Sequence, residues 1–197
     1  AVATYPSLAE LSYVKGLTSA IQTQLDTKLQ TGLHSIYIPA SAIYPNSSDG
    51  CSALTQVELS NGPEIKVLDF DTGSDEFAQF TISFPKSWNE GTLTYEVYWM
   101  GGTTNTNDVV WQLKGVCFDD SDPVDTTFGS PANTTAKAHS GTANDVNRSI
   151  GAACTVKNAT TDSITFFQIN RDESADTYNT DARLLGMKIF YTIDAVN

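Results

Sequence analysis

Positive charge is scarce in this sequence. Across 197 residues, lysine and arginine together number 11 against 23 aspartates and glutamates, so the net charge is −12 at pH 7. Proteins that bind nucleic acid place clustered lysines and arginines against phosphates, and an anionic membrane surface repels a chain of this charge. We therefore expect neither nucleic acid nor a membrane among its partners.

Long apolar runs and a leader pattern are also missing. No apolar stretch of about 18 residues is present, which is the length that a membrane-spanning helix needs. The first residues, Ala1 to Tyr5, lack the basic region and apolar core of a signal peptide. Either the chain is intracellular when it is made, or a processed segment has been lost.

Cysteine is rare. The three cysteines, Cys51, Cys117 and Cys154, are widely spaced and odd in number, which does not suit a disulfide framework. Cys117 lies in the apolar run 113–118, so we expect a buried thiol there. One disulfide among the three, with one thiol left free, is the alternative. The sequence has no phosphate-binding loop, Cys-x-x-Cys or Gly-x-Ser-x-Gly motif, and no cofactor is expected.

The sequence does contain short aromatic and β-branched runs, separated by threonine, serine, asparagine and glycine, as in a sheet protein with many turns. About eight to ten strands are indicated, at the spacing of a two-sheet protein. The predicted fold class is mainly β, a jelly-roll-like antiparallel β-sandwich with a short N-terminal α-helical stem. Residues 119–147 are expected to form a long loop with one short strand near Thr126. The expected strands are 34–39, 55–59, 65–70, 77–84, 92–99, 109–118, 155–157, 163–170 and 185–192.

Alternation along the segment 92–99 predicts which of its side chains are buried. Residues two apart in a strand share a face, and Tyr98 lies on the face opposite to the apolar set. Tyr98 and Trp88 are candidates for an exposed surface that stacks on a sugar, although a place in the core or at a subunit interface is favoured. The apolar set, expected in the core, is Leu93, Tyr95, Val97 and Trp99.

Residues 1–32 follow a different pattern. Ser7-Leu8-Ala9-Glu10 is a capping box ahead of an apolar repeat, and Gly16 interrupts that repeat as a C-cap or kink. A short polar helix with one narrow apolar stripe is marginal in water. The stripe must therefore be covered, either by the β domain or by copies of itself around a symmetry axis. The stripe residues, expected to make oligomer contacts, are Leu11, Val14, Leu17, Ile21, Leu25 and Leu29.

Two parts are thus predicted, a helical stem for attachment and oligomerisation at 1–32 and a β-sandwich head at 33–197. Residues 11–28, LSYVKGLTSAIQTQLDTK, resemble the helical segment LxYVxGVTSAIQTQLxxK of phage tail-fibre and virion structural proteins. Residues 77–195 resemble a β module of phage and marine-virus proteins, through the stretches WNEGTLTYEVYWM, VVWQLKGVCF, FFQINRD and DARLLGMKIFYTIDA. The resemblance implies a virion protein, located in the virion and assembled in the cytoplasm of the host bacterium, with other virion proteins as partners.

The function predicted from this resemblance is a homotrimeric short fibre or spike. Its head would attach to a host-surface glycan or protein, and three weak sites would act together by avidity. The loops 101–108 and 119–147 are the expected exposed surface. The alternative within the same class is a capsid decoration or head-fibre protein.

A hydrolase is the alternative from a different class. The stretch Phe70-Asp71-Thr72-Gly73-Ser74 is similar to the aspartic-protease motif, in which two aspartates share one proton and activate water. The chain has one such motif only, Asp69 adds a charge close to Asp71, and Asp-Thr-Gly-Ser is also a common turn. The protein is therefore expected not to be an enzyme.

Metal binding is weakly indicated at one acidic segment. Asp69, Asp71 and Asp75 offer the hard oxygens that Ca²⁺ prefers, but they lack the glycine spacing and terminal glutamate of an EF-hand loop. The two histidines, His34 and His139, have no ligand partner at close spacing. No metal site is predicted.

Overall fold

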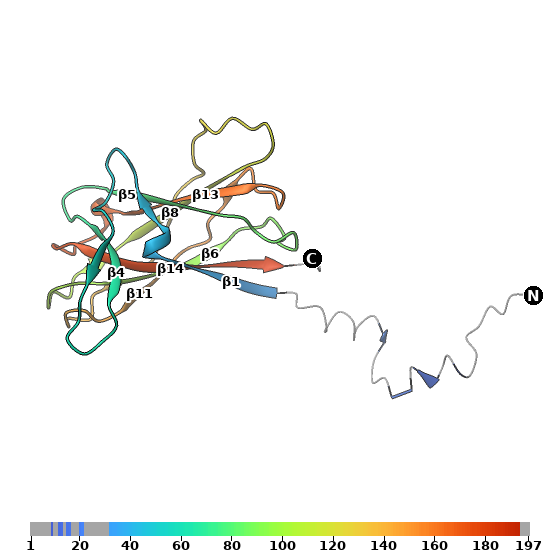
Figure 1. The fold of residues 1–197 in the computed structure, drawn as a ribbon, viewed down its shortest axis with the longest axis horizontal. Coiled ribbons are helices and arrows are strands. Elements are labelled where there is room, and N and C mark those ends of the chain that lie inside the picture. The colour runs from blue at the N-terminus through green and yellow to red at the C-terminus, as the bar shows by residue number, and fades with distance from the viewer. Residues whose placement is uncertain (1–8, 10–11, 14, 17–19, 22–31, 194–197) are drawn as a thin grey trace, which may run out of the picture.

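Two six-stranded sheets pack face to face in the computed structural model (Figure 1). The structure describes residues 32–193 and, before them, only Ala9, 12–13, 15–16 and 20–21. Alternating buried and exposed residues give each sheet one face toward the other sheet and one face toward solvent. The antiparallel, mainly β sandwich predicted from the sequence is confirmed.

The first sheet, called sheet 1, has the strand order β11-β6-β14-β4-β3, with β1 also paired to β14. All of its pairs are antiparallel. The long strand β14 lies at its centre, and β6 pairs along one side of it. On the other side, β4 pairs with the first part of β14 and β1 pairs with the rest. Its strands are β1 (Gly32–Pro39), β3 (Thr55–Val57), β4 (Ile65–Phe70), β6 (Thr94–Met100), β11 (Asn147–Ile150) and β14 (Ala182–Ile193).

The second sheet, called sheet 2, has the order β12-β8-β13-β5-β2, with β9 also paired to β8. Only the β12–β8 pair in it is parallel. Its strands are β2 (Tyr44–Pro45), β5 (Phe77–Ile82), β8 (Trp111–Phe118), β9 (Ala132–Asn133), β12 (Val156–Lys157) and β13 (Ile164–Arg171). A separate two-stranded ribbon and two short 3-10 helices complete the described elements: β7 (Asp108–Val109), β10 (Lys137–Ala138), η1 (Ala40–Ala42) and η2 (Glu173–Ala175).

Aromatic side chains from both sheets fill the core between them. The rings of Phe70 in sheet 1 and Trp111 in sheet 2 meet edge to face, with centroids 5.1 Å apart, and Phe80 stacks on Phe167 at 5.2 Å. The apolar set predicted on one face of 92–99, from Leu93 to Trp99, is at most 1% exposed, so that prediction is confirmed. Fully buried rings of this size dominate the burial energy of such a sandwich.

For Trp88 the structure confirms the favoured place in the core and rules out the exposed sugar-stacking surface. Its side chain is only 2% exposed and its ring lies 4.2 Å from that of Phe84. The chain turns after Pro85 and bridges to Ile193 at the end of β14, which folds the indole into the core. Trp88 therefore lies on no exposed sugar-stacking surface.

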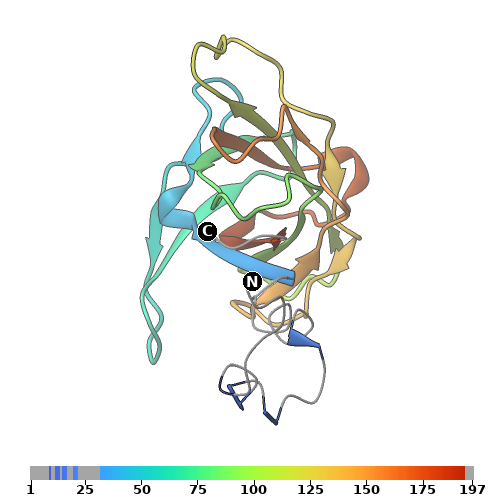
Figure 2. The same cartoon turned by 90° about the vertical axis from the view of Figure 1, so that its right-hand side faces the viewer.

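The segment 119–147 differs from its prediction in one respect. The strand expected near Thr126 is wrong, since β9, β10 and β11 lie later in the chain, and the loop 119–131 projects from the sandwich (Figures 1 and 2). The sequence pattern did not predict β11, because the buried residues of this strand are polar. Ser149 accepts a hydrogen bond from the indole of Trp99 at 3.0 Å, so a polar side chain is satisfied where the sequence pattern would require an apolar one.

The three cysteines are buried and free. Burial as a thiol is confirmed for Cys117, and the alternative of one disulfide is wrong. Burial also raises the pKa of Cys51 and of Cys154 to about 12, because the thiolate is poorly solvated in the core.

The predicted stem falls mainly outside the described residues, and so do Leu11, Val14, Leu17, Leu25 and Leu29. Of the stripe, the structure describes Ile21, whose side chain is 51% exposed. Gly16 has a φ of +96°, the conformation expected of a glycine that ends a helix. The helical stem stays a prediction. Within the described part of the chain, no helix has the length and apolar character to cross a membrane.

Candidate functional site

The outer face of sheet 1 carries a β-bulge at the centre of β14. The register between β14 and β6 shifts between Leu184 and Gly186, and Gly186 has a φ of +150°. A Cβ added at this glycine would lie 2.6 Å from the hydroxyl oxygen of Tyr37 and 2.6 Å from the carbonyl oxygen of Ile38. The bulge thus opens a space on the outer face that the Tyr37 side chain covers.

Tyr37 and Tyr98 face each other across this glycine. Tyr98 is paired with Gly186 from the opposite side, on β6, and the two tyrosine rings meet edge to face with centroids 6.3 Å apart. The Tyr37 hydroxyl donates to the carbonyl oxygen of Leu185 at 3.4 Å, and its side chain is 52% exposed. Two aromatic rings are therefore held on the solvent side of the sheet.

Charged neighbours fix the orientation of Tyr98. Its hydroxyl donates to the Glu96 carboxylate at 2.8 Å, and Glu96 pairs with Arg148 on β11 at 3.4 Å. The hydrogen bond to Glu96 and, after it, burial raise the pKa of Tyr98, while burial raises the pKa of Tyr37. Both phenols stay protonated at neutral pH, and both offer a hydroxyl beside an aromatic face.

A cleft of about 450 Å³ lies over these rings, and we call it the tyrosine cleft. It combines aromatic and aliphatic walls with one ammonium group, that of Lys188. In the part of the chain that the structure describes, Lys188 forms no ion pair, and its Nζ lies 5.9 Å from the Phe190 ring. The residues that line the tyrosine cleft are Tyr37, Tyr98, Val146, Leu185 and Lys188.

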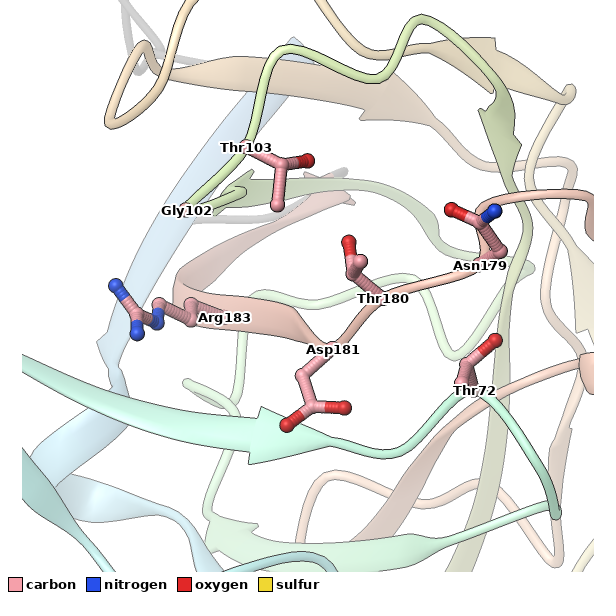
Figure 3. Close-up of a pocket in the computed structure, with 7 residues that line it drawn as sticks. All are labelled: Thr72, Gly102, Thr103, Asn179, Thr180, Asp181 and Arg183. Carbon is pink, nitrogen blue, oxygen red and sulfur yellow. The ribbon is translucent and has the colours of Figure 1, made fainter.

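A second cleft, of about 460 Å³, lies at the end of sheet 1 where β4 and β6 finish and β14 begins; we call it the end cleft (Figure 3). Six of its seven lining residues have polar side chains, and the seventh is Gly102. In Figure 3 the side chains of Thr72, Thr103 and Thr180 lie around one opening, with Asn179 and Arg183 at opposite ends of it. The residues that line the end cleft are Thr72, Gly102, Thr103, Asn179, Thr180, Asp181 and Arg183.

A buried arginine shapes the loop that enters β14. The Arg171 side chain is 0% exposed and pairs with Asp176, which is 4% exposed, at 2.5 Å. The same guanidinium donates to the carbonyl oxygens of Thr180 at 2.8 Å, of Phe70 at 3.2 Å and of Tyr178. A buried ion pair with its donors satisfied in this way fixes one loop conformation.

Tyr178 joins the three loops of the end cleft. Its carbonyl oxygen accepts a hydrogen bond from the Thr72 hydroxyl at 3.0 Å, and its own hydroxyl lies 3.1 Å from that of Thr103. Its ring is fully buried, and its hydroxyl lies where a side chain at Gly101 would stand. Asn105 donates to Asn179 nearby. The end cleft is thus built before any ligand arrives.

The acidic residues singled out in the sequence do not form a metal site. Asp69 pairs with Arg183 at 3.5 Å. Burial raises the pKa of the Asp69 carboxyl, and the positive charge of Arg183 partly offsets that increase. Asp75 accepts a hydrogen bond from the backbone of Glu173 at 2.9 Å. Across the described residues, no three histidine, cysteine or acidic side chains gather as a metal would require.

Asp71 is the third of these residues, and the structure places it in a turn. Its exposed carboxylate accepts from the backbone N–H of Gly73 at 2.9 Å, while its own N–H donates to Glu76 at 2.7 Å. This is the common turn of an Asp-x-Gly segment. Because the protease mechanism needs a second aspartate sharing a proton, the aspartic-protease alternative is wrong.

Sequence reasoning found one half of the tyrosine cleft. Tyr98 was a candidate, and the structure places it on the outer face. Tyr37 was missed, although the sequence holds a signal: Tyr37 lies between Ile36 and Ile38 in the expected strand 34–39, and alternation places it on the face opposite to theirs. The end cleft was not predicted, because its residues come from three separate loops.

No protein-family model matches the chain, and no curated protein matches it. Among similar solved structures is a xylan-binding module, CBM15, with 12% identity over 83% of this chain and 100% of that chain, at a TM-score of 0.46. Another is the CBM36-1 domain of a multidomain xylanase from the hindgut metagenome of Trinervitermes trinervoides, with 10% identity over 83% and 99% of the two chains, at a TM-score of 0.45.

A third is the CBM22-1–GH10 part of an endo-1,4-β-D-xylanase from Clostridium thermocellum, complexed with xylohexaose. It is 14% identical over 84% of this chain, which spans 29% of that chain, at a TM-score of 0.49. At TM-scores below 0.5 these likenesses carry no inference about the ligand of this chain.

The comparisons correct the function predicted from the sequence. The similar structures named here are carbohydrate-binding modules and xylanase parts, and no phage fibre or capsid protein is among them. The prediction of a phage fibre, spike or capsid decoration protein is withdrawn. The homotrimer and the virion partners belonged to that prediction and are withdrawn with it. The resemblance of residues 11–28 to a fibre stem is untested, since most of them lie outside the described residues.

Proposed function

We propose that this protein is a non-catalytic carbohydrate-binding domain, and that the tyrosine cleft holds a sugar ring of an oligosaccharide or polysaccharide. The observation that carries the proposal is the pair of tyrosine rings, Tyr37 and Tyr98, fixed edge to face on the solvent side of sheet 1.

The chemistry of a sugar ring suits this surface. A pyranose has faces of C–H groups, which pack on aromatic rings, and a rim of hydroxyls, which need hydrogen-bonding partners. The tyrosine cleft offers both kinds of group. Tyr98 and Tyr37 supply faces and hydroxyls, Leu185 supplies apolar wall, and the Lys188 ammonium supplies donors. Clefts of a few hundred Å³ with apolar walls and a few directed polar groups are the usual form of small-ligand sites.

The site is also pre-organised, which favours binding. Tyr98 is oriented through Glu96 and Arg148, and Tyr37 is confined over Gly186. A ligand therefore does not have to order these side chains on binding, and the entropy that ordering would cost is saved.

Affinity electrophoresis tests the proposal. The protein is run through native gels that contain xylan, β-glucan, mannan or pectin, beside gels without polysaccharide. We expect at least one polysaccharide to retard the protein, and we expect Tyr37→Ala and Tyr98→Ala each to weaken that binding at least about tenfold. Tyr44→Ala is the matched control, since Tyr44 is 48% exposed and lies on β2 in the other sheet.

Two results would overturn the proposal. One is the absence of retardation by every polysaccharide. The other is retardation that the Tyr37 and Tyr98 variants reduce no more than the Tyr44 variant does.

A further inference from the structure

We propose that the end cleft is a second sugar subsite, which takes a further unit of the same saccharide chain that the tyrosine cleft holds. This inference rests on the proposed function and extends it: the ligand becomes a chain of several hydroxyl-rich units that runs along the outer side of β14, rather than a single sugar.

The two clefts follow one another along β14. Arg183 lines the end cleft and Leu185 lines the tyrosine cleft, and both side chains point to the outer face of β14. Two residues along a strand span about 7 Å, which is on the order of the length of one or two sugar units. A linear saccharide that lies over Leu185 can therefore reach both clefts.

The end cleft holds a polar atom that the protein leaves without a partner. The hydroxyl oxygen of Thr180 is buried and has no hydrogen-bond partner among the described residues, although the neighbouring hydroxyls of Thr72 and Thr103 both have one. Buried polar groups in folded proteins are nearly always satisfied by protein, water or ligand. A rotation of the Thr180 side chain to another staggered rotamer would turn this hydroxyl into the cleft, where a ligand hydroxyl can donate to it or accept from it.

The charges of the cleft indicate an uncharged ligand that both donates and accepts. Asp181 supplies an acceptor and Arg183 supplies donors, and Arg183 is already partly neutralised by Asp69 at 3.5 Å. No aromatic ring lines this cleft, so recognition here depends on hydrogen bonds rather than on stacking. Sugar hydroxyls meet these requirements, because each is at once a donor and an acceptor.

The cleft does not depend on its ligand for its shape. Arg171 and Tyr178 hold the three loops through a buried ion pair and two partly buried hydrogen bonds. Thr180 contributes to this framework through its carbonyl oxygen, which accepts from Arg171 at 2.8 Å. Replacing its side-chain hydroxyl therefore leaves the framework in place, and the residue can be changed without loss of the fold.

Isothermal titration with saccharides of increasing length tests the inference. The probes are xylo-oligosaccharides from the disaccharide to the hexasaccharide, with the cello- and manno-oligosaccharide series in parallel. For the wild-type protein we expect affinity to rise with chain length. Thr180→Val and Asp181→Asn should each remove most of that rise, by about five- to tenfold for the longest chain, and should leave binding of the shortest binding oligomer unchanged.

Thr155→Val is the matched control, because Thr155 is exposed and precedes β12 at the edge of the other sheet. If the two end-cleft variants bind the long saccharides as the wild type does, the inference is overturned while the proposed function stands. If affinity does not rise with length, the inference is likewise overturned. If the wild type binds no saccharide at all, both proposals are overturned together.

Discussion

The hydroxyl of Tyr37 lies where a side chain on Gly186 would begin: a Cβ on Gly186 would be 2.6 Å from the Tyr37 hydroxyl oxygen. The two residues belong to adjacent strands, β1 and β14. The bulge at Gly186 and the position of Tyr37 are therefore one structural feature, and the form of the tyrosine cleft depends on it.

The first prediction concerns this glycine. Gly186→Ala should displace Tyr37 and strain the backbone, because φ is +150° there, and should lower the free energy of unfolding by roughly 1–3 kcal/mol. Polysaccharide binding should fall with it. Thermal denaturation and affinity electrophoresis measure the two effects. Gly62→Ala is the control, since a Cβ there makes only ordinary contacts with Leu59, at 3.7 Å and beyond. An alanine at 186 that leaves binding intact would show that the cleft does not need the bulge.

The second prediction concerns the buried ion pair. Arg171→Met leaves Asp176 as an unpaired buried carboxylate and frees the loop that enters β14, so the free energy of unfolding should fall by about 3–5 kcal/mol. Chemical denaturation measures it. As a comparison, Lys86→Met breaks a pair whose side chains are 77% and 64% exposed, and should have little effect. Equal effects of the two substitutions would argue against the framework role of Arg171.

The sequence predicted the strands well because their alternation is local. Alternation along 92–99 places Tyr98 on the face opposite to the buried set, and alternation along 34–39 likewise places Tyr37 on the face opposite to its apolar neighbours. Neither segment shows that Tyr37 pairs with Lys188 while Tyr98 pairs with Gly186, since register between strands distant in sequence depends on the whole sheet. The tyrosine pair is therefore a property of the assembled sheet.

The end cleft escaped prediction, and the burial of Trp88 was favoured over an exposed position without a local pattern that requires it. The loops of the end cleft meet through Arg171. In the sequence Arg171 is an ordinary charged residue at the end of an apolar run, and its burial depends on the ion pair with Asp176. Trp88 follows a proline in a polar segment, and only the return of the chain to Ile193 buries it. In each case a contact distant in sequence overrides the local pattern.

The third prediction concerns alkaline pH. The hydrogen bond to Glu96 raises the pKa of Tyr98 above its ordinary value of 10.0. Its contribution to stability is thus complete below that value and is lost as the pH rises through the folded-state pKa. Thermal denaturation across this range should show a steeper loss of stability for the wild type than for Tyr98→Phe, which has no proton to lose. Parallel profiles for the two proteins would contradict the assignment.

The fourth prediction concerns the thiols. Burial raises the pKa of Cys51 and of Cys154 to about 12, so at pH 8 both remain protonated as well as inaccessible, and the reactive thiolate is scarce. The folded protein should react with a thiol-specific chromogenic reagent only at the rate of unfolding, whereas the denatured protein should react at once. A fast reaction of either thiol in the folded protein would contradict this burial.

The most direct test of sugar binding at the tyrosine cleft is fluorine NMR of the protein labelled with 3-fluorotyrosine, with resonances assigned by single Tyr→Phe substitutions. A saccharide that the protein binds is titrated in. The resonances of Tyr37 and Tyr98 should move together along one binding curve while that of Tyr44, in the other sheet, stays in place. A saccharide that binds and leaves the Tyr37 and Tyr98 resonances unmoved would contradict the account.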